Sequence, residues 1–238
     1  NDVSLEVLPG QVVALMGAPG AGKSTLVSLL ARFYDADSGS VSIDGINVRD
    51  ATLSSVRSTV GIVQQDVFLF SASVRDNIAY GKQGASIDEV VDAAKTAQLH
   101  EEIMALPKGY ETVVGERGTS LSGGQRQRLS IARTLILDPP VLVLDDSTAS
   151  VDAGTESRIQ EAIRGVVKGR TTFIIAHRLS SIQHAETVVV LDHGQIAEMG
   201  SPVELAASGG LFTHVSELQY ATNLNGHASV ASLGGADA

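Results

Sequence analysis

Residues 17–24 read GAPGAGKS and follow the apolar run 12–16, and a helical pattern continues over 23–33. In a strand–loop–helix of this kind, consecutive backbone N–H groups converge on an anion at a helix N-terminus, and glycines let the backbone approach it. Lys23 can supply a positive charge to the β- and γ-phosphates, and the Ser24 hydroxyl can bind Mg²⁺. The residues therefore predict a nucleoside triphosphate site, rather than a chance glycine turn. The predicted contacts are Gly17, Ala18, Pro19, Gly20, Ala21, Gly22, Lys23, Ser24 and Thr25.

A second chemical group lies at Asp145, which closes the apolar run 141–144. A carboxylate at a strand end near a phosphate loop is the usual anchor for Mg²⁺. The alternative is an N-cap for a helix that begins near Ser147. The phosphate loop, which we define as residues 17–24, favours the metal role.

Composition excludes several classes of protein. The chain has 238 residues and no cysteine, which rules out disulfides, thiolate metal sites and cysteine nucleophiles. Its formal net charge is −10, and no Lys or Arg follows Arg178, so we expect no nucleic acid partner. No apolar stretch approaches the ~20 residues of a membrane-spanning helix. The chain starts without Met and inside a strand pattern at 3–7, so we expect it to be a piece of a longer protein.

Short β-branched runs alternate with helical patterns, which predicts an α/β core around a mainly parallel sheet. Turn residues around 41–45 predict an antiparallel hairpin. From about 70 to 135 the pattern becomes helical, and we expect a helical lobe inserted into the core. Within it, Ser86 is the expected N-cap of a helix over 87–99. Ser201, followed by Pro202, is the expected cap of a later helix. The Ala/Ser/Gly/Asn composition after Tyr220 predicts a disordered tail over 221–238, so the domain would span 1–220.

Residues 121–125, which we call the signature segment, read LSGGQ and are followed by RQR. A phosphate loop followed by this segment resembles the nucleotide-binding domain of ATP-binding cassette (ABC) transporters. The resemblance implies a P-loop NTPase core, a mixed and mainly parallel sheet with helices, carrying an antiparallel β subdomain and an inserted α-helical subdomain. It also implies that this chain completes the ATP site of a second nucleotide-binding domain. The residues that would contact that ATP are Ser122, Gly123, Gly124 and Gln125. The chain should therefore act only in a pair, either with a copy of itself or with a related domain.

The same resemblance assigns the remaining site residues. Gln65, chosen over Gln64, resembles the glutamine that touches Mg²⁺ and the attacking water, so the implied metal ligands are Ser24, Gln65 and Asp145. His177 follows an apolar strand and resembles the histidine that contacts the γ-phosphate. Asp152 resembles a residue that touches the partner across the interface. The alternatives are a surface amide for Gln65 and an ordinary polar strand end for His177.

Asp146 departs from the family pattern, which usually has glutamate there as the general base for hydrolysis. A base must lie within about 2.6–3.2 Å of the proton it takes, and losing one methylene withdraws the carboxylate by roughly 1 Å. In related heterodimeric exporters, the half with this aspartate builds a slow site and lends its intact signature segment to the partner. The alternative is that Asp146 works through a bridging water.

Four further segments, 32–35, 73–78, 106–110 and 115–118, resemble exporter cassettes, and Glu116 would contact a transmembrane partner. The sequence therefore predicts the ATP-hydrolysing motor domain of a membrane exporter, with Asp146, His177, Gln65 and Lys23 as its catalytic residues. It would need ATP and Mg²⁺, join transmembrane domains of the same exporter, and lie at the cytoplasmic face of the cell membrane. Two alternatives are a degenerate nucleotide clamp with very low turnover and a soluble DNA-associated cassette, which the acidic composition disfavours.

Overall fold

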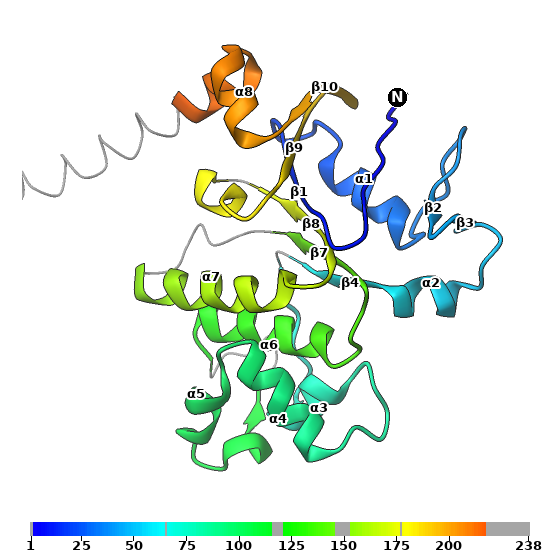
Figure 1. Cartoon of the computed structure of the whole chain (residues 1–238). Helices are drawn as coiled ribbons and strands as arrows, with labels where there is room; N and C mark the ends of the chain where they lie inside the picture. The colour runs from blue at the N-terminus through cyan, green and yellow to red at the C-terminus, as the bar shows by residue number, and fades with distance from the viewer. Residues whose placement is uncertain (1, 65, 116–120, 146–152, 177, 218–238) are drawn as a thin grey trace, which may run out of the picture.

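The centre of the molecule is a six-stranded sheet (Figure 1). The computed structural model describes residues 2–64, 66–115, 121–145, 153–176 and 178–217. The strand order is β10-β9-β1-β8-β7-β4, and every neighbouring pair is parallel except β9 and β10. The predicted mixed, mainly parallel sheet is therefore confirmed. The strands are β1 (Val12–Met16), β4 (Val60–Val63), β7 (Val141–Asp145), β8 (Thr171–Ile175), β9 (Thr187–Asp192) and β10 (Gln195–Gly200).

The two faces of the sheet carry different helices. Because side chains alternate along a strand, Val13 and Leu15 of β1 point to one face and Ala14 to the other. Helix α1 (Lys23–Leu30) packs on the first face, while α6 (Gly123–Leu135) and α7 (Ala153–Val167) pack on the second. Figure 1 shows α1 above the sheet and α6 and α7 below it. Fully burying each aliphatic side chain contributes about 1.5–3 kcal/mol, so both faces hold their helices firmly.

The predicted helical subdomain, which includes α6, covers the second face of the sheet and extends away from it (Figure 1). Its first long helix, α4, begins where the sequence predicts: the Ser86 hydroxyl accepts from the Glu89 N–H at 3.2 Å, and the Glu89 carboxylate accepts from the Ser86 N–H at 2.8 Å. This reciprocal pair is a capping box. The helix ends at Thr96 rather than Leu99, because Gln98 adopts a φ of 54°. Besides α6, the elements of this subdomain are β5 (Ala72–Ser73), α3 (Val74–Ala79), α4 (Ile87–Thr96), α5 (His100–Met104), η1 (Gly109–Glu111) and β6 (Val113–Val114).

The predicted antiparallel hairpin is β2 (Ser42–Ile43) and β3 (Ile46–Asn47), joined by Asp44 and Gly45 at φ of 50° and 76°. Two positive φ angles in a two-residue turn suit the right-handed twist of the flanking strands. Helix α2 (Leu53–Thr59) follows, and the other short elements are η4 (Leu179–Ile182) and α8 (Pro202–Ser208).

Of two expectations about the chain ends, one is wrong and the other stays a prediction. Residues 3–7 are not a strand, although Leu5 and Val7 pack against the core beside α1 and keep the alternation that suggested one. The predicted tail, 221–238, lies outside the described residues, and the bounds 1–220 and 70–135 remain predictions. In the described part of the chain, no helix is both long enough and apolar enough to span a bilayer.

Candidate functional site

The phosphate loop leaves β1 and turns into α1 through three glycines with positive φ. The angles are 142° at Gly17, 81° at Gly20 and 103° at Gly22. At Gly17 a side chain is excluded twice, since a Cβ there would also collide with the carbonyl oxygen of Leu191 in β9. Gly22 is the N-cap of α1, and as a glycine it has no side chain that could cap the helix. The first N–H groups of this helix are therefore not covered by a capping side chain, which leaves them available to an anion.

Lys23 brings a buried cation into this loop. The residue is 6% exposed, and its Nζ donates to the carbonyl oxygens of Gly17 at 2.8 Å and Ala18 at 3.0 Å. Burial lowers the pKa of the Lys23 ammonium, and the charge of Asp145 opposes that shift. The ammonium is thus held against the loop backbone, within electrostatic reach of a carboxylate that arrives from another strand.

The predicted metal anchor lies at the carboxyl edge of the sheet. Asp145 ends β7 and pairs in register with Ile175 of β8, which in turn pairs with Leu15 just before the loop. The neighbouring strand β4 ends at the same level, with Val63 opposite Leu144. Ligands of parallel α/β sheets bind at this edge. A serine hydroxyl, an amide and a carboxylate offer the oxygen ligands that Mg²⁺ prefers, so the residues fit that ion.

Five predicted residues lie outside the described residues: Gln65, Glu116, Asp146, Asp152 and His177. Their assigned roles remain predictions. The structure does describe the strands that lead to Gln65, Asp146 and His177. These strands, β4, β7 and β8, are neighbours in the sheet and end together.

The signature segment forms the start of α6. Ser122 is the N-cap: its hydroxyl accepts from the Gln125 backbone N–H at 3.2 Å, and the Gln125 side-chain oxygen Oε1 accepts from the Ser122 N–H at 2.8 Å. Ser122 and Gly123 are exposed, whereas Gly124 is buried. The capping boxes of α4 and α8 use glutamate at the corresponding position, but α6 uses a neutral glutamine and has no acidic residue in its first turn. This helix end is therefore compatible with a negative ligand.

Sequence reasoning missed how α6 is anchored. Arg133 donates to the Phe68 carbonyl oxygen at 2.8 Å, to the Asn77 carbonyl oxygen at 2.9 Å and to the Asn77 side-chain oxygen at 2.6 Å. Burial lowers the pKa of Arg133. These bonds connect α6 to the stretch that follows residue 65. No local pattern in the sequence indicates these partners for the guanidinium.

A hollow of about 320 Å³ lies beside the phosphate loop. Met16 and residues 17–19 form one wall, and Leu211 and Val215 form another. Nothing in the sequence connects residues 211–217 with the loop, because almost the whole chain separates them. The full lining is Met16, Gly17, Ala18, Pro19, Ala176, Leu191, Asp192, Leu211 and Val215.

Comparison with known families decides what this arrangement belongs to. Residues 1–149 match the family described as "ABC transporter". The chain belongs to the ABC transporter family. It is an ATP-binding domain of that family, as the sequence predicted, and the P-loop NTPase fold with its inserted helical subdomain is confirmed.

Relatives of this ABC domain are longer proteins. The chain is 52% identical over 225 residues to the "Putative multidrug export ATP-binding/permease protein YgaD" of Bacillus subtilis (strain 168), covering 94% of the chain and 38% of the relative. It is 50% identical over 219 residues to a similarly named protein, SAOUHSC_02003, of Staphylococcus aureus (strain NCTC 8325 / PS 47), with 92% and 38% covered. A solved bacterial Atm1-family ABC exporter with ATP bound superposes with a TM-score of 0.86 at 47% identity, covering 91% of this chain and 38% of that one. The chain thus spans 38% of the length of these proteins.

Proposed function

We propose that this ABC domain is the ATP-hydrolysing motor of a membrane exporter and works by ATP-dependent, head-to-tail dimerisation. One observation carries the proposal. Two helix N-termini suited to anions, those of α1 and α6, belong to helices on opposite faces of the sheet. A triphosphate bound at α1 of one protomer would then be completed by α6 of a second copy or of a related domain.

The roles of the residues follow from this arrangement. The loop 17–25 and the Lys23 ammonium hold the phosphates of one protomer, and Ser122, with the N–H groups behind it, meets them from the other. Ser24, Gln65 and Asp145 would hold Mg²⁺, which when bound neutralises charge on the β- and γ-phosphates. Asp146 would orient and deprotonate the attacking water, and His177 would contact the γ-phosphate.

The setting of the motor is also proposed. The names of the two bacterial relatives combine ATP binding with a permease, and this favours a motor over an idle clamp. We infer that transmembrane domains of the same exporter are partners and that the chain works at the cytoplasmic face of the membrane. The net charge of −10 argues against a nucleic acid partner.

Complementation between two inactive variants tests the shared site. In the complete protein, Lys23→Ala removes the cation of the loop, and Ser122→Ala removes the tip of α6. Each variant alone should lose most ATP turnover. A mixed dimer, isolated through two different tags, should regain one working site, because the intact loop of one copy faces the intact α6 of the other. Mixed dimers with no more turnover than either parent would contradict a site shared between copies.

A further inference from the structure

Glu102 of α5 bonds to arginines from two other helices. The Arg128 Nη2 of α6 donates to both carboxylate oxygens of Glu102, at 2.6 and 2.7 Å. The Arg158 Nη1 of α7 donates to one of the same oxygens. One carboxylate therefore joins α5, α6 and α7, and the three residues come from positions far apart in the sequence.

The two halves of this bridge differ in burial. Arg128 is 2% exposed and Glu102 21%, so the carboxylate supplies the countercharge that a buried guanidinium requires. Arg158 is 60% exposed. An exposed ion pair contributes little to folding stability, so stability alone gives no reason for the second half. What the second half does is connect α7 to α6.

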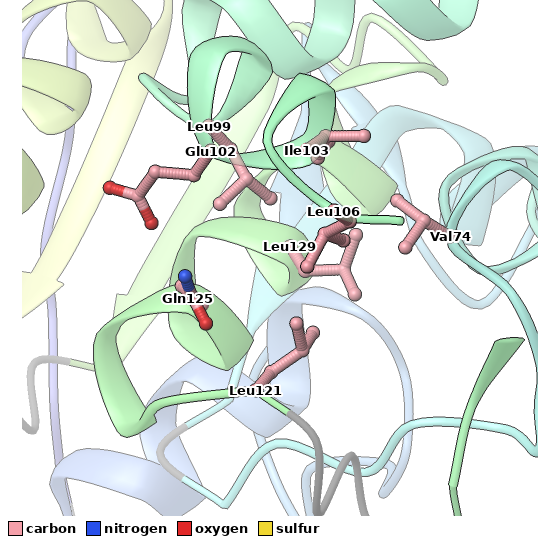
Figure 2. A pocket seen from close by; sticks show the side chains of 8 residues that line it. All are labelled: Val74, Leu99, Glu102, Ile103, Leu106, Leu121, Gln125 and Leu129. Carbon is pink, nitrogen blue, oxygen red and sulfur yellow. The ribbon is translucent and has the colours of Figure 1, made fainter. Parts of the chain in front are cut away.

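Both connected helices begin at segments assigned to the partner contact. Ser122 caps α6, and Arg128 lies further along the same helix. Helix α7 begins at Ala153, directly after Asp152 in the chain. Figure 2 shows Glu102 and Gln125 at the same small cavity, where apolar side chains such as Leu121 gather and the Glu102 carboxylate points away from them. The bridge therefore lies close to the first turn of α6.

We propose that Glu102 is a positioning residue that holds α6 and α7 in one mutual orientation, so that α6 meets a partner's nucleotide while the start of α7 meets the partner protomer itself. This inference rests on the proposed function, since it assumes that Ser122 acts on ATP bound by another protomer. The phosphate loop leads into α1, which packs on the opposite face of the sheet from α6 and α7, so changes at Glu102 should leave ATP binding by a single protomer unaffected.

The sharpest test breaks the exposed half of the bridge. In the complete protein, Arg158→Gln should lower kcat about tenfold through misorientation of α6 and α7, and leave the melting temperature unchanged. The Kd of a fluorescent ATP analogue at the loop should also stay unchanged. Arg164→Gln is the matched control, because Arg164 is exposed on the same helix. It should leave kcat at the wild-type value.

Two more variants show whether the effect runs through the carboxylate. Glu102→Gln should lower kcat at least as much as Arg158→Gln, and combining the two should add nothing further, as expected for residues that act through one contact. Glu102→Asp keeps the charge that neutralises Arg128 but is one methylene too short to reach both arginines. It should retain the melting temperature and lose turnover.

The outcomes separate the two proposals. Wild-type kcat in Arg158→Gln, or a turnover loss that vanishes at a lower assay temperature, would overturn the role of Glu102. If Lys23→Ala, made and assayed in parallel, abolishes turnover, the motor function stands and only the role of Glu102 is lost. Full turnover in Lys23→Ala would instead remove the proposed function itself.

Discussion

Helices α1 and α6 both present an N-terminus suited to a phosphate, yet they are built in opposite ways. Helix α1 starts at a glycine and has a buried lysine as its first residue, and apolar residues such as Val27 hold it to the sheet. Helix α6 starts at an exposed serine in a complete capping box. Its later turns are tied to other elements through Arg128 and Arg133.

The difference indicates two tasks. The N-terminus of α1 encloses its ligand, because the backbone groups of the phosphate loop and the Lys23 ammonium would surround a bound phosphate. The N-terminus of α6 instead presents an exposed residue, Ser122, to the surroundings of the molecule. Polar bonds further along the helix, such as those of Arg133, keep α6 in place. A receptor must be close-fitting, which is why it depends on glycine. A presented tip must be rigid, and polar anchors with fixed geometry provide that.

The largest expected effect comes from adding one methyl group to the enclosing end. Gly17→Ala would place a Cβ against the Leu191 carbonyl oxygen at a φ of 142°, so the loop must distort. We expect a loss of more than about 2 kcal/mol in the free energy of unfolding and complete loss of ATP binding. Chemical denaturation and nucleotide titration measure the two effects.

Gly20→Ala is the control for that change. Gly20 also has a positive φ, 81°, but a Cβ there meets nothing within 4 Å. The Gly20→Ala variant should lose only about 1–2 kcal/mol in the free energy of unfolding, which is the penalty of the left-handed conformation for a residue with a Cβ. Equal losses for the two variants would mean that close approach to β9 is not what requires Gly17.

A smaller effect is expected at the presenting end, where Ser122→Ala removes the N-cap of α6. The helix should lose about 1 kcal/mol of stability. Turnover should fall by more than that loss explains, because the hydroxyl also meets the partner's phosphate. Ser86→Ala removes the same kind of capping box from α4 and is the matched control. The same turnover loss in both variants would reduce Ser122 to a structural cap.

Much of this arrangement could be predicted from the sequence because it is local. The β-branched runs at 60–63 and 171–175 coincide with β4 and β8, since parallel strands buried on both faces need such residues. Ser86 and Ser201 cap their helices as predicted, because a capping box is complete within four residues. The phosphate loop and the signature segment could be found for the same reason.

What could not be predicted depends on partners far along the chain. The helix predicted over 23–33 ends at Leu30, where Arg32 takes a φ of 52° and donates to the carbonyl oxygens of Val48 and Ala51. Nothing in the local pattern near Arg32 indicates those carbonyls. The Glu102 bridge is the same case: three charged residues on three helices have no periodicity that would reveal their contact.

The capping boxes of α6 and α4 also differ in charge, because the third helical residue is the neutral Gln125 in α6 and Glu89 in α4. Gln125→Glu keeps the geometry of the box and adds a carboxylate near the positive end of the helix, which should stabilise the fold by about 0.3–1 kcal/mol. The same carboxylate would repel a partner's phosphates, and we expect turnover to fall about tenfold. Thermal unfolding and steady-state ATPase assays should therefore move in opposite directions. A variant that gains or keeps full turnover would contradict an anion at this helix end.

The smallest expected effect is a pH dependence that α4 has and α6 lacks. Hydrogen bonds from Lys82 and then from the Ser86 N–H lower the pKa of Glu89 from 4.5 to about 2. Because the folded-state pKa is below the unfolded value, this stabilisation is present above pH 4.5 and is lost as the pH falls toward about 2. Glu89→Gln should remove this part of the acid dependence of thermal unfolding, and Gln125→Glu should create a similar one in α6. An ordinary pKa for Glu89 in a carboxyl NMR titration would contradict this pH dependence. The repulsion between a carboxylate at residue 125 and a partner's phosphates would then be the remaining reason for glutamine in α6.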